Sequence, residues 1–567
     1  MSNALFRKKN INSILAEGSD NSHGGGGLKR VLTVKDLTFF GIAAILGAGS
    51  FSSLGGAVFN GGPGVIVLFI ITGIACAFTA FCYSDFASRI PVAGSAYTYA
   101  YASFGELFAW IIGWALIMEY SIGNIYVAYS WSDYFTSFME RMNVHIPAYL
   151  STSYMEAKHG IESGSTNKDV IAAWNNAPVV NGLKMILDLP ALIINFLITY
   201  LVYRGIKESR NFSNLMVILK LGVVFLIIVV GGYLVWHNGL TSNWLPQNDA
   251  GVKSFMPNGF SGVMAAVAGV FFAYIGFDAV SVLAEESKDP QRDLPKGMIY
   301  SLVICTVIYI LLTLVLSGAV HYKNFEGVGD PLAFIFEPQN LNIGWMQLLV
   351  SICAVVAMTS VLLVFQMGQP RIWMSMSRDG LLPAVFQKIH SKFQTPSFAT
   401  IVTGFVVGVP ILFTDKTFVL DFTSIATLFA FVLVCGGVLL LPTKEKEPGK
   451  FHLPFISSRI IFPILIIGTI IIIQLFSKNY FADLFNLNGD AANLTFNISS
   501  LIFWLSCIIF SVITLFKNWS LIPLLGLVTC LYLLTGMTAM NWAWFGGWLV
   551  LGLVVYFLYG YKKSKLA

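Results

Sequence analysis

The sequence predicts an all-α polytopic membrane protein, because apolar stretches long enough to cross a bilayer recur along nearly the whole chain. Of the 567 residues, 56% are hydrophobic and only 11% are charged, and the mean hydropathy is +0.74. No soluble domain of this size has such a composition. A helix of about 20 apolar residues crosses the roughly 30 Å of hydrocarbon in a bilayer. Lipid is therefore the expected environment of most of the chain.

Fourteen stretches have the length of a membrane span. Each is expected to be helical, since lipid offers no water to pair with free N–H and C=O groups. The expected ranges are 36–58, 64–84, 107–134, 183–203, 212–236, 259–284, 298–320, 344–370, 396–414, 421–441, 459–476, 498–516, 519–536 and 543–560. The long segment 138–182 is expected to be an external loop. No stretch is left over for a separate soluble domain.

The positions of lysine and arginine predict that both ends of the chain are cytoplasmic, in a multi-pass protein of the plasma membrane. With the N-terminus inside, cytoplasmic segments hold most of the 34 basic residues, in agreement with the positive-inside rule. Residues 1–35 are polar and contain the run Gly24 to Gly27, which is typical of a flexible tail. That tail has no apolar core of a signal peptide, so the first span is expected to direct insertion. The net charge of +5 reflects this topology and does not indicate a nucleic-acid partner.

The reactive side chains do not form the groupings of an enzyme. All seven cysteines fall in expected spans and are interpreted as small core residues, while the seven histidines are scattered over tails, loops and span ends. Neither a metal spacing, a nucleophile–base pair nor a phosphate-binding loop is visible. The sequence therefore predicts no catalysis, no metal and no cofactor. A channel is not favoured either, because no filter sequence is repeated.

Two of the spans contain signals for an interruption of the helix. Span 1 includes GIAAILGAGSFSSLGG, residues 41–56, with five glycines, and span 6 includes GVFFAYIGFDA, residues 269–279, with Gly276 and Asp278 in mid-membrane. Such glycines also serve in close packing of membrane helices. Interruptions at matching places in two halves of a chain, however, indicate the binding site of a transporter. The pairing of spans 1 and 6 favours that second interpretation.

A break in each helix would create a site for a zwitterion. It leaves free N–H groups at the start of one half-helix and free C=O groups at the end of the other, with partial charges of opposite sign. A carboxylate and an ammonium a few ångströms apart can each bind to one of these ends. Glycine permits the break and lets a ligand approach the main chain.

Several motifs resemble one known family. They are GIAAILGAGSF in span 1, PVAGSAYTYAYASFGEL after span 2, FFAYIGFDAVSVLAEESKDPQRDLPKG across span 6, GQPRIWMSMSRDGLLP after span 8 and IATLFAFVLVCGGVLLL in span 10. In this order and spacing the chain resembles the bacterial cationic amino acid transporter branch of the amino acid/polyamine/organocation superfamily, closely over residues 30 to 445.

The resemblance implies a domain organisation. It is a leucine-transporter-type five-plus-five inverted repeat with alternating access, in which 36–204 holds spans 1–4, 205–236 holds span 5 and 259–441 holds spans 6–10. Residues 442–567 would add four C-terminal spans and a cytoplasmic tail.

The resemblance also implies a substrate site. The carboxylate would meet the main-chain N–H groups of Gly47, Ala48 and Gly49. The ammonium would meet the carbonyls of Ile45 in span 1 and of Phe272, Ala273 and Ile275 in span 6. The chain departs from the family at Ser50, where a bulky aliphatic residue is usual, and Ser52 and Ser53 follow.

Two charged residues lie deep in expected spans. Lys220 in span 5 has a position where related transporters bind sodium, and the resemblance implies that it couples transport to protons. The alternative to a coupling role is that the aliphatic part of the Lys220 side chain extends to the inner membrane interface and places the ammonium there. Glu119 in span 3 is a second candidate for proton transfer, or a structural carboxyl.

Other residues are expected at the edges of the site. Asp278 is expected to cap the second half-helix of span 6, and Phe277 and Phe272 to help close over the substrate. Glu285 and Arg371 are expected near the cytoplasmic mouth, as part of an ion-pair gate or of a solvated rim.

Met358 in span 8 matches a family position that faces the substrate side chain, or it fills a gap between helices. A methionine and aromatics form an apolar pocket of limited size, which favours small neutral amino acids such as alanine. Exchange of amino acids and transport of cationic amino acids remain alternatives to proton symport. A transporter-like sensor, or the membrane subunit of a larger assembly, is a more remote one. The expected partners are thus an amino acid, protons and the bilayer, and the sequence does not indicate an oligomeric state.

Overall fold

The fold is known from a computed structural model. It describes residues 5–9, 32–47, 49–90, 95–164, 167–205, 210–248, 251–281, 287–441, 451–476, 478–486 and 491–565. Within these ranges the chain is mostly helical, and its strands are the two-residue pair β1 (Val179–Val180) and β2 (Leu183–Lys184), which form an antiparallel hairpin.

The helices divide into three groups along the chain. The first group is α3 (Val34–Ile45), α4 (Leu54–Gly61), α5 (Val65–Arg89), α6 (Ser95–Ser103), α7 (Glu106–Arg141), α8 (Tyr154–Glu162), α9 (Lys168–Asn176), α10 (Leu189–Tyr203), α11 (Arg210–Leu226) and α12 (Gly232–His237). The second is α13 (Gly259–Ala265), α14 (Val267–Phe272), α15 (Pro290–Ala319), α16 (Pro331–Phe334), α17 (Gly344–Arg378), α18 (Ser397–Ile411) and α19 (Lys416–Leu440). The third is α20 (Ser458–Phe476), α21 (Tyr480–Leu484), α22 (Ala491–Phe516), α23 (Leu521–Leu534), α24 (Ala539–Val555) and α25 (Tyr561–Lys563).

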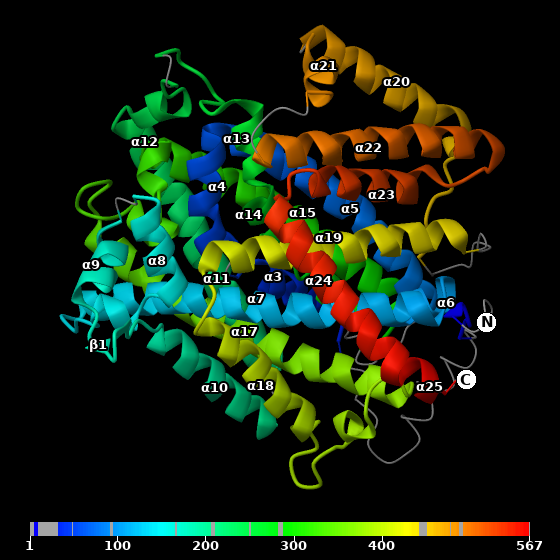
Figure 1. Cartoon of the computed structure of the whole chain (residues 1–567). Coiled ribbons are helices and arrows are strands. Elements are labelled where there is room, and N and C mark those ends of the chain that lie inside the picture. The colour runs from blue at the N-terminus through cyan, green and yellow to red at the C-terminus, as the bar shows by residue number, and fades with distance from the viewer. Residues whose placement is uncertain are drawn as a thin grey trace.

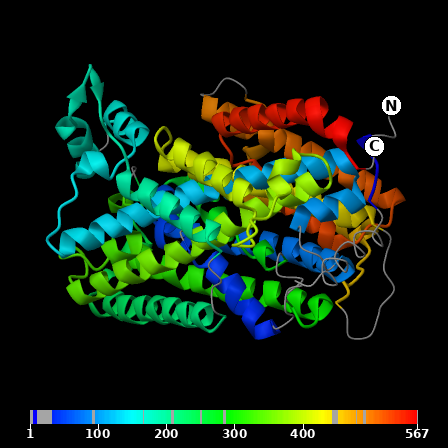
Figure 2. The same ribbon diagram turned by 90° about the horizontal axis from the view of Figure 1, so that it is seen from below.

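The long helices lie side by side as a bundle with two distinct ends. α7 packs along α17 and α19, and α5 packs along α15. Both described ends of the chain lie at one end of the bundle, whereas α8, α9 and β1 gather at the other (Figures 1 and 2). The end that holds α8 and α9 is called the loop end below.

Helical segments occur in all fourteen ranges expected from the sequence. In the part of the chain that the structure describes, nine helices are long and apolar enough to cross a membrane. α10, α18 and α23 are shorter apolar helices of 15, 15 and 14 residues. The chain therefore forms a polytopic, mostly helical membrane protein. The number of fourteen crossings stays a prediction.

Large apolar side chains lie on the outer surface as well as in the core. α20 and α22 expose many isoleucines, among them Ile460, Ile464 and Ile502. In water such an exposed apolar surface would drive aggregation, whereas in a bilayer it faces the lipid chains, which are equally apolar. The core also holds tyrosines and tryptophans, among them Tyr134, Tyr309 and Trp110.

The segment expected as a long external loop is partly ordered. It contains α8, α9 and the β hairpin, with a small core of Ala157, Ala173, Ala177 and Ile186. Ser153 caps α8 by accepting from the N–H of Glu156, and Asn167 caps α9. The Asn167 side chain also donates to the carbonyl of Gly327, which ties this segment to the loop before α16.

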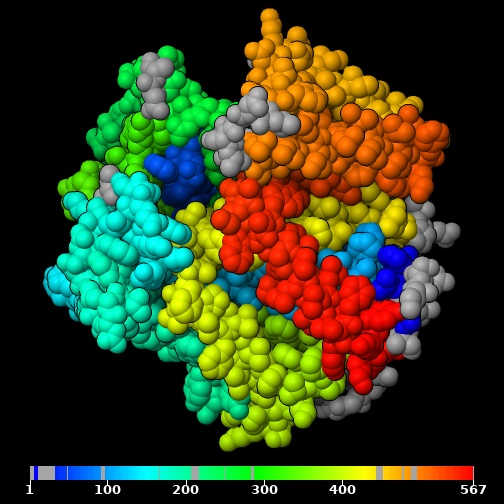
Figure 3. All heavy atoms as spheres, in the orientation of Figure 1, coloured from blue at the N-terminus to red at the C-terminus, as the bar shows by residue number. Residues whose placement is uncertain are grey.

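The C-terminal helices α23 and α24 are fixed to the bundle. α23 packs against α5 and α19, and α24 crosses α7 and α19. The indoles of Trp114 and Trp548 stack at 4.8 Å and each donates to the other residue's carbonyl, at 2.9 and 3.1 Å. In Figure 3 α24 covers part of the surface of α19, and α22 lies next to it on the same face.

Candidate functional site

Both helices that the sequence marked for interruption are broken. α3 ends at Ile45, Leu46 leaves the helical region with ψ of 76°, and a π-helical turn (Gly49–Ser53) begins the second part of the span. In the sixth expected span, α14 ends at Phe272 and the chain turns through residues 273–277. Gly276 has φ of +116° in that turn, a conformation that favours glycine.

The two breaks lie against each other. A Cβ atom at Gly49 would collide with the Cα of Ala273, and one at Gly276 would lie 3.0 Å from the carbonyl carbon of Ala44. The glycines therefore let the two main chains meet without intervening side chains. This contact brings the predicted binding residue Ala273 to Gly49, which lies more than 220 positions earlier in the sequence.

One side chain joins the two breaks, and the sequence reasoning missed it. The hydroxyl of Tyr309 in α15 lies 2.9 Å from the carbonyl oxygen of Ile45 and 2.6 Å from that of Ala273. Its ring packs against Phe69 and Tyr274. The two carbonyls thus converge on one donor, as they would converge on an ammonium group. A tyrosine in the middle of an apolar span was the available signal, since a buried Tyr hydroxyl needs a partner.

A cavity of about 10 Å³ lies beside the contact between the breaks, and this volume holds at most one water molecule. An amino acid needs more space, so the site is closed in this conformation. The lining residues are Ala44, Ile45, Gly49, Val127, Phe272, Ile275, Val361 and Phe365.

The serines that follow the first break are used within the bundle. The Ser53 hydroxyl lies 2.6 Å from the carbonyl oxygen of Gly49 and 2.9 Å from that of Gly269 in α14. The Ser50 hydroxyl donates to the carbonyl of Gly47 at 3.0 Å, and that of Ser52 to Gly329 at 3.1 Å. These hydroxyls therefore bond main-chain carbonyls and leave the apolar character of the cavity unchanged.

A layer of side chains closes the cavity toward the loop end. The ring of Phe272 packs edge-on against Tyr126 at 4.6 Å, and Lys416 lies over Tyr126 at 5.6 Å. Lys416 forms an ion pair with Asp133 and donates to the carbonyl of Gly329 at 3.5 Å. The name outer layer is used below for Tyr126, Asp133, Phe272 and Lys416.

Further acidic groups surround the outer layer. Burial raises the pKa of the Glu156 carboxyl to about 7, and the charge of Asp133 adds to that increase while Lys416 opposes it. Burial likewise raises the pKa of Asp330 to about 7, with Glu337 and Asp133 adding to the increase. Asp415 pairs with His159 at 3.3 Å.

The deep charges lie on helices next to the breaks. Lys220 in α11 is 2% exposed, its helix packs against α3 and α17, and it interacts electrostatically with Cys353 of α17. Glu119 in α7 is buried near Asp278 and Thr427. Asp278 is buried and follows Gly276 by two residues. Its role as a cap of the second half-helix stays a prediction.

Several expected site residues do not line the cavity, among them Gly47, Ala273 and Met358. Met358 is fully buried in α17, one turn before the lining residue Val361. Phe277 packs edge-on against Tyr83 at 6.0 Å and near Phe431 at 5.2 Å. Arg371 is exposed on α17.

Two of the predicted positions, Ala48 and Glu285, lie outside the described residues. At the other end of the bundle, the Lys9 ammonium forms an ion pair with the Asp379 carboxylate at 2.9 Å. The sequence did not suggest this pair. The Tyr97 hydroxyl also donates to Asp379, at 2.6 Å.

The chain is similar to a family of known proteins over most of its length. Residues 32–513 match the amino acid permease family, and residues 521–564 match the model of the C-terminus of such permeases. The chain is 35% identical to the branched-chain amino acid permease BcaP of Bacillus subtilis over the full length of both. It is 34% identical to the methylthioribose transporter of the same organism, over 99% of each chain.

A plant relative extends the comparison. The vacuolar cationic amino acid transporter 2 of Arabidopsis thaliana is 35% identical over 79% of this chain and 65% of its own length. All three relatives are named as carriers of small molecules across membranes, and none as an enzyme. With two facing broken helices and a family match over most of its length, the chain belongs to the amino acid permease family, in the amino acid/polyamine/organocation superfamily.

Proposed function

We propose that the protein is a secondary active transporter that binds an amino acid at its two broken helices and releases it on the other side by alternating access. The observation that carries this proposal is the convergence of the Ile45 and Ala273 carbonyls on one hydrogen-bond donor, the Tyr309 hydroxyl. A substrate ammonium beside that hydroxyl would find the same two carbonyls. The main-chain N–H groups from Gly47 to Gly49 would bind the carboxylate, because the start of a helix attracts anions.

The lining of the cavity favours a neutral, apolar side chain on the substrate. Val127, Val361, Phe365 and Phe272 are apolar, and no acidic side chain lines the cavity among the described residues. A guanidinium or a second ammonium there would lack a counter-charge, which is costly in a dry site. Small neutral amino acids therefore remain the preferred substrates. The branched-chain amino acids, which the name of the relative BcaP mentions, are the next larger candidates.

Alternating access would require the outer layer to open. A cavity of about 10 Å³ cannot admit an amino acid, so Phe272 and Tyr126 must move apart and the ion pair of Lys416 with Asp133 must separate. The packing of α5 on α15 and of α7 on α17 supports the five-plus-five inverted repeat. In that arrangement the second and third spans of one half lie beside their equivalents in the other half.

Proton coupling is assigned to Lys220 in this proposal. Its helix lies between α3 and α17, so a charged Lys220 can hold the first span to the eighth, and a neutral one can release them. A desolvated lysine changes its protonation readily. Glu119, buried near Asp278, is the second group proposed to carry a proton.

Uptake into proteoliposomes tests the function. Labelled L-alanine or L-valine should enter faster when a proton gradient is directed inward, and a sodium gradient should have no effect. Counterflow without any gradient would show that the protein exchanges amino acids. Uptake of methylthioribose without uptake of any amino acid would contradict the proposal, because that compound lacks the zwitterion that the two helix ends are proposed to bind.

A further inference from the structure

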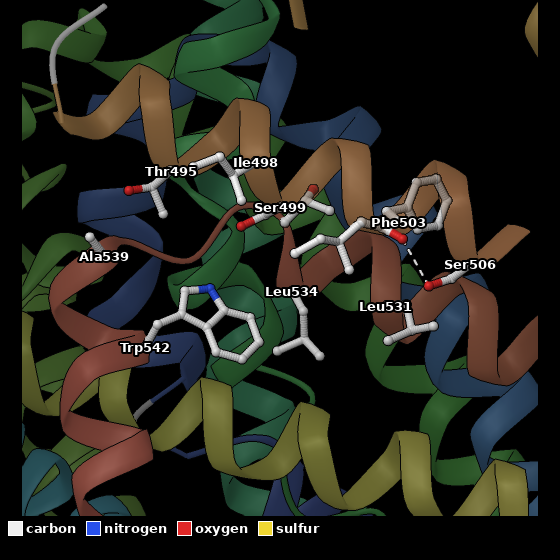
Figure 4. Close-up of a pocket in the computed structure, with 11 residues that line it drawn as sticks. Thr495, Ile498, Ser499, Phe503, Ser506, Leu531, Leu534, Ala539 and Trp542 are labelled. Atoms are coloured by element: carbon white, nitrogen blue, oxygen red, sulfur yellow. Dashed lines mark hydrogen bonds between the residues drawn. The ribbon is translucent and has the colours of Figure 1, made fainter. Parts of the chain in front are cut away.

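A second and larger cavity, separate from the one at the breaks, lies between the three C-terminal helices α22, α23 and α24. Its volume is about 390 Å³, which is within the range of sites for small ligands. Figure 4 shows the cavity with α22 on one side, α24 on the other and α23 behind. The residues used in the argument are Ser499, Ile502, Ser506, Leu534, Thr535 and Trp542. We call it the C-terminal cavity.

The C-terminal cavity opens to the surface that faces lipid. Ile502 on its rim is 60% exposed, and Ile498 one turn earlier is 44% exposed. Along α22 the lining runs from Thr495 to Ser506, about 16 Å at the helical rise. This length is roughly one leaflet of a 30 Å hydrocarbon core, beginning near the N-terminal end of α22.

One polar group of this cavity is left without a partner. The Trp542 indole nitrogen is buried, and among the residues that the structure describes no atom accepts a hydrogen bond from it. In Figure 4 this nitrogen lies on the edge of the indole that is turned toward Ser499, across the cavity. The hydroxyls of Ser506 and Thr535 are used by their own helices, since they donate to the carbonyls of Ile502 and Tyr532 at 2.8 and 2.7 Å.

The unpaired N–H favours an occupant that brings a free hydrogen-bond acceptor. A main-chain carbonyl of a partner helix is already bonded within that helix and could accept only through its second lone pair, as the carbonyl of Trp548 does from Trp114. A glycerolipid has ester carbonyls at the level of the interface, where tryptophan is enriched. Trp542 lies in the first turn of α24, close to the end of that helix, and therefore near this level.

We propose that the C-terminal cavity binds one membrane glycerolipid, with the acyl chain along Ile502 and Leu534 and an ester carbonyl accepting a hydrogen bond from the Trp542 indole. The lipid would fill the space between α22 and α24 and link α22 to the part of the protein that contains the broken helices. The site is independent of the proposed transport function, because no residue of the closed cavity at the breaks takes part in it.

A competition between two lipids tests the hydrogen bond. The full chain is reconstituted in dialkyl phosphatidylcholine vesicles with a trace of diacyl phosphatidylcholine that has a photoactivatable acyl chain. Cross-linked peptides are then identified by mass spectrometry. Labelling of the peptide around Ile502 should exceed that of the peptide around Ile464, an exposed residue on α20. Unlabelled diacyl lipid should displace the probe about two- to tenfold better than the dialkyl lipid, which has the same chains and no carbonyl.

Two tryptophan variants provide the control. Trp542→Phe removes the donor and keeps a ring, and it should abolish the advantage of the diacyl lipid. Trp544→Phe, on an exposed indole two residues along the same helix, should leave that advantage intact. Unchanged labelling around Ile464 in both variants would show that they fold.

Three outcomes overturn the proposal. They are equal displacement by both lipids in the wild type, labelling around Ile502 no stronger than around Ile464, and a cross-link from this peptide to a second copy of the chain in place of lipid.

Discussion

The hydroxyl of Tyr309 lies 2.6 Å from the main-chain oxygen of Ala273, and 2.9 Å from that of Ile45 in the other broken helix. This one side chain therefore holds the ends of two separate half-helices in a fixed relation. The same two oxygens are the proposed ligands of the substrate ammonium. A change at Tyr309 should consequently affect binding more than it affects folding.

Tyr309→Phe should raise the KM for amino acid uptake by about five- to a hundredfold, because two buried carbonyls lose their donor and about 1–3 kcal/mol of interaction with it. Tyr274→Phe is the matched control, since its hydroxyl bonds the carbonyl of Phe69, outside the cavity, at 2.8 Å. Uptake kinetics in proteoliposomes would measure both variants. Equal changes in KM would show that Tyr309 has only a structural role.

Gly49→Ala should abolish transport, because its Cβ would collide with the main chain of Ala273 and force the two breaks apart. Gly56→Ala should retain wild-type uptake, since no atom lies within 4 Å of the added methyl group. Uptake and the yield of folded protein in detergent would be measured for both variants. Normal transport by Gly49→Ala would show that the observed contact is not needed at any stage of the cycle.

The substrate range should depend on Val361 more than on Met358. Val361 lines the cavity and also fills the space beside Gly47, whereas Met358 lies one turn away among buried residues. Val361→Ala should therefore improve the uptake of larger neutral amino acids relative to alanine. Met358→Ala should change this ratio less, and competition of unlabelled amino acids against labelled alanine would measure it. The reverse order would support the original assignment of Met358 to the pocket.

Closure at the loop end should depend on the pH at that end through Glu156. Its pKa is about 7 in the closed arrangement against an ordinary value of 4.5, so the closed form binds a proton more tightly than a form with a solvated carboxyl. The added stability of the closed form is therefore greatest at acidic pH. It is lost as the pH rises from about 4.5 through 7.

The groups around Glu156 are the carboxyls of Asp133 and Asp415, Lys416 and the partly exposed His159, while Asp330, also with a pKa near 7, acts in the same direction. A cysteine at Ser52, in a chain without other cysteines, should react with a membrane-impermeant thiol reagent more slowly at pH 5 than at pH 8, once each rate is divided by that of a free thiol at the same pH. Glu156→Gln, which imitates the protonated carboxyl, should reduce this difference. Faster reaction at pH 5 would contradict the sign of the effect.

Lys220→Met should lose uptake driven by an inward proton gradient while keeping amino acid counterflow. The variant removes the charge on α11 and preserves much of the side chain's length. Uptake at the wild-type level under the same gradient would show that proton coupling resides elsewhere, and Glu119→Gln would then be the next variant to measure.

The sequence was most informative where composition or glycine dictates structure. The apolar stretches predicted the helices, and the glycines of the first and sixth spans predicted both breaks, because main-chain freedom is a local property. Tyr309 and the pair of Lys416 with Asp133 were not predicted. The two charges are 283 residues apart, and only the folded bundle brings them together. Val361 lines the cavity and Met358 does not, because of the way α17 is rotated about its axis. The sequence of an almost uniformly apolar helix does not specify that rotation.

The central claim is that main-chain groups at the two breaks bind the zwitterionic head of the substrate. Inhibition of labelled valine uptake by three analogues tests it most directly: unlabelled valine, the amine that lacks the carboxylate and the acid that lacks the ammonium. The account predicts that valine inhibits and that neither analogue does so at the same concentration. Equal inhibition by all three compounds would contradict it.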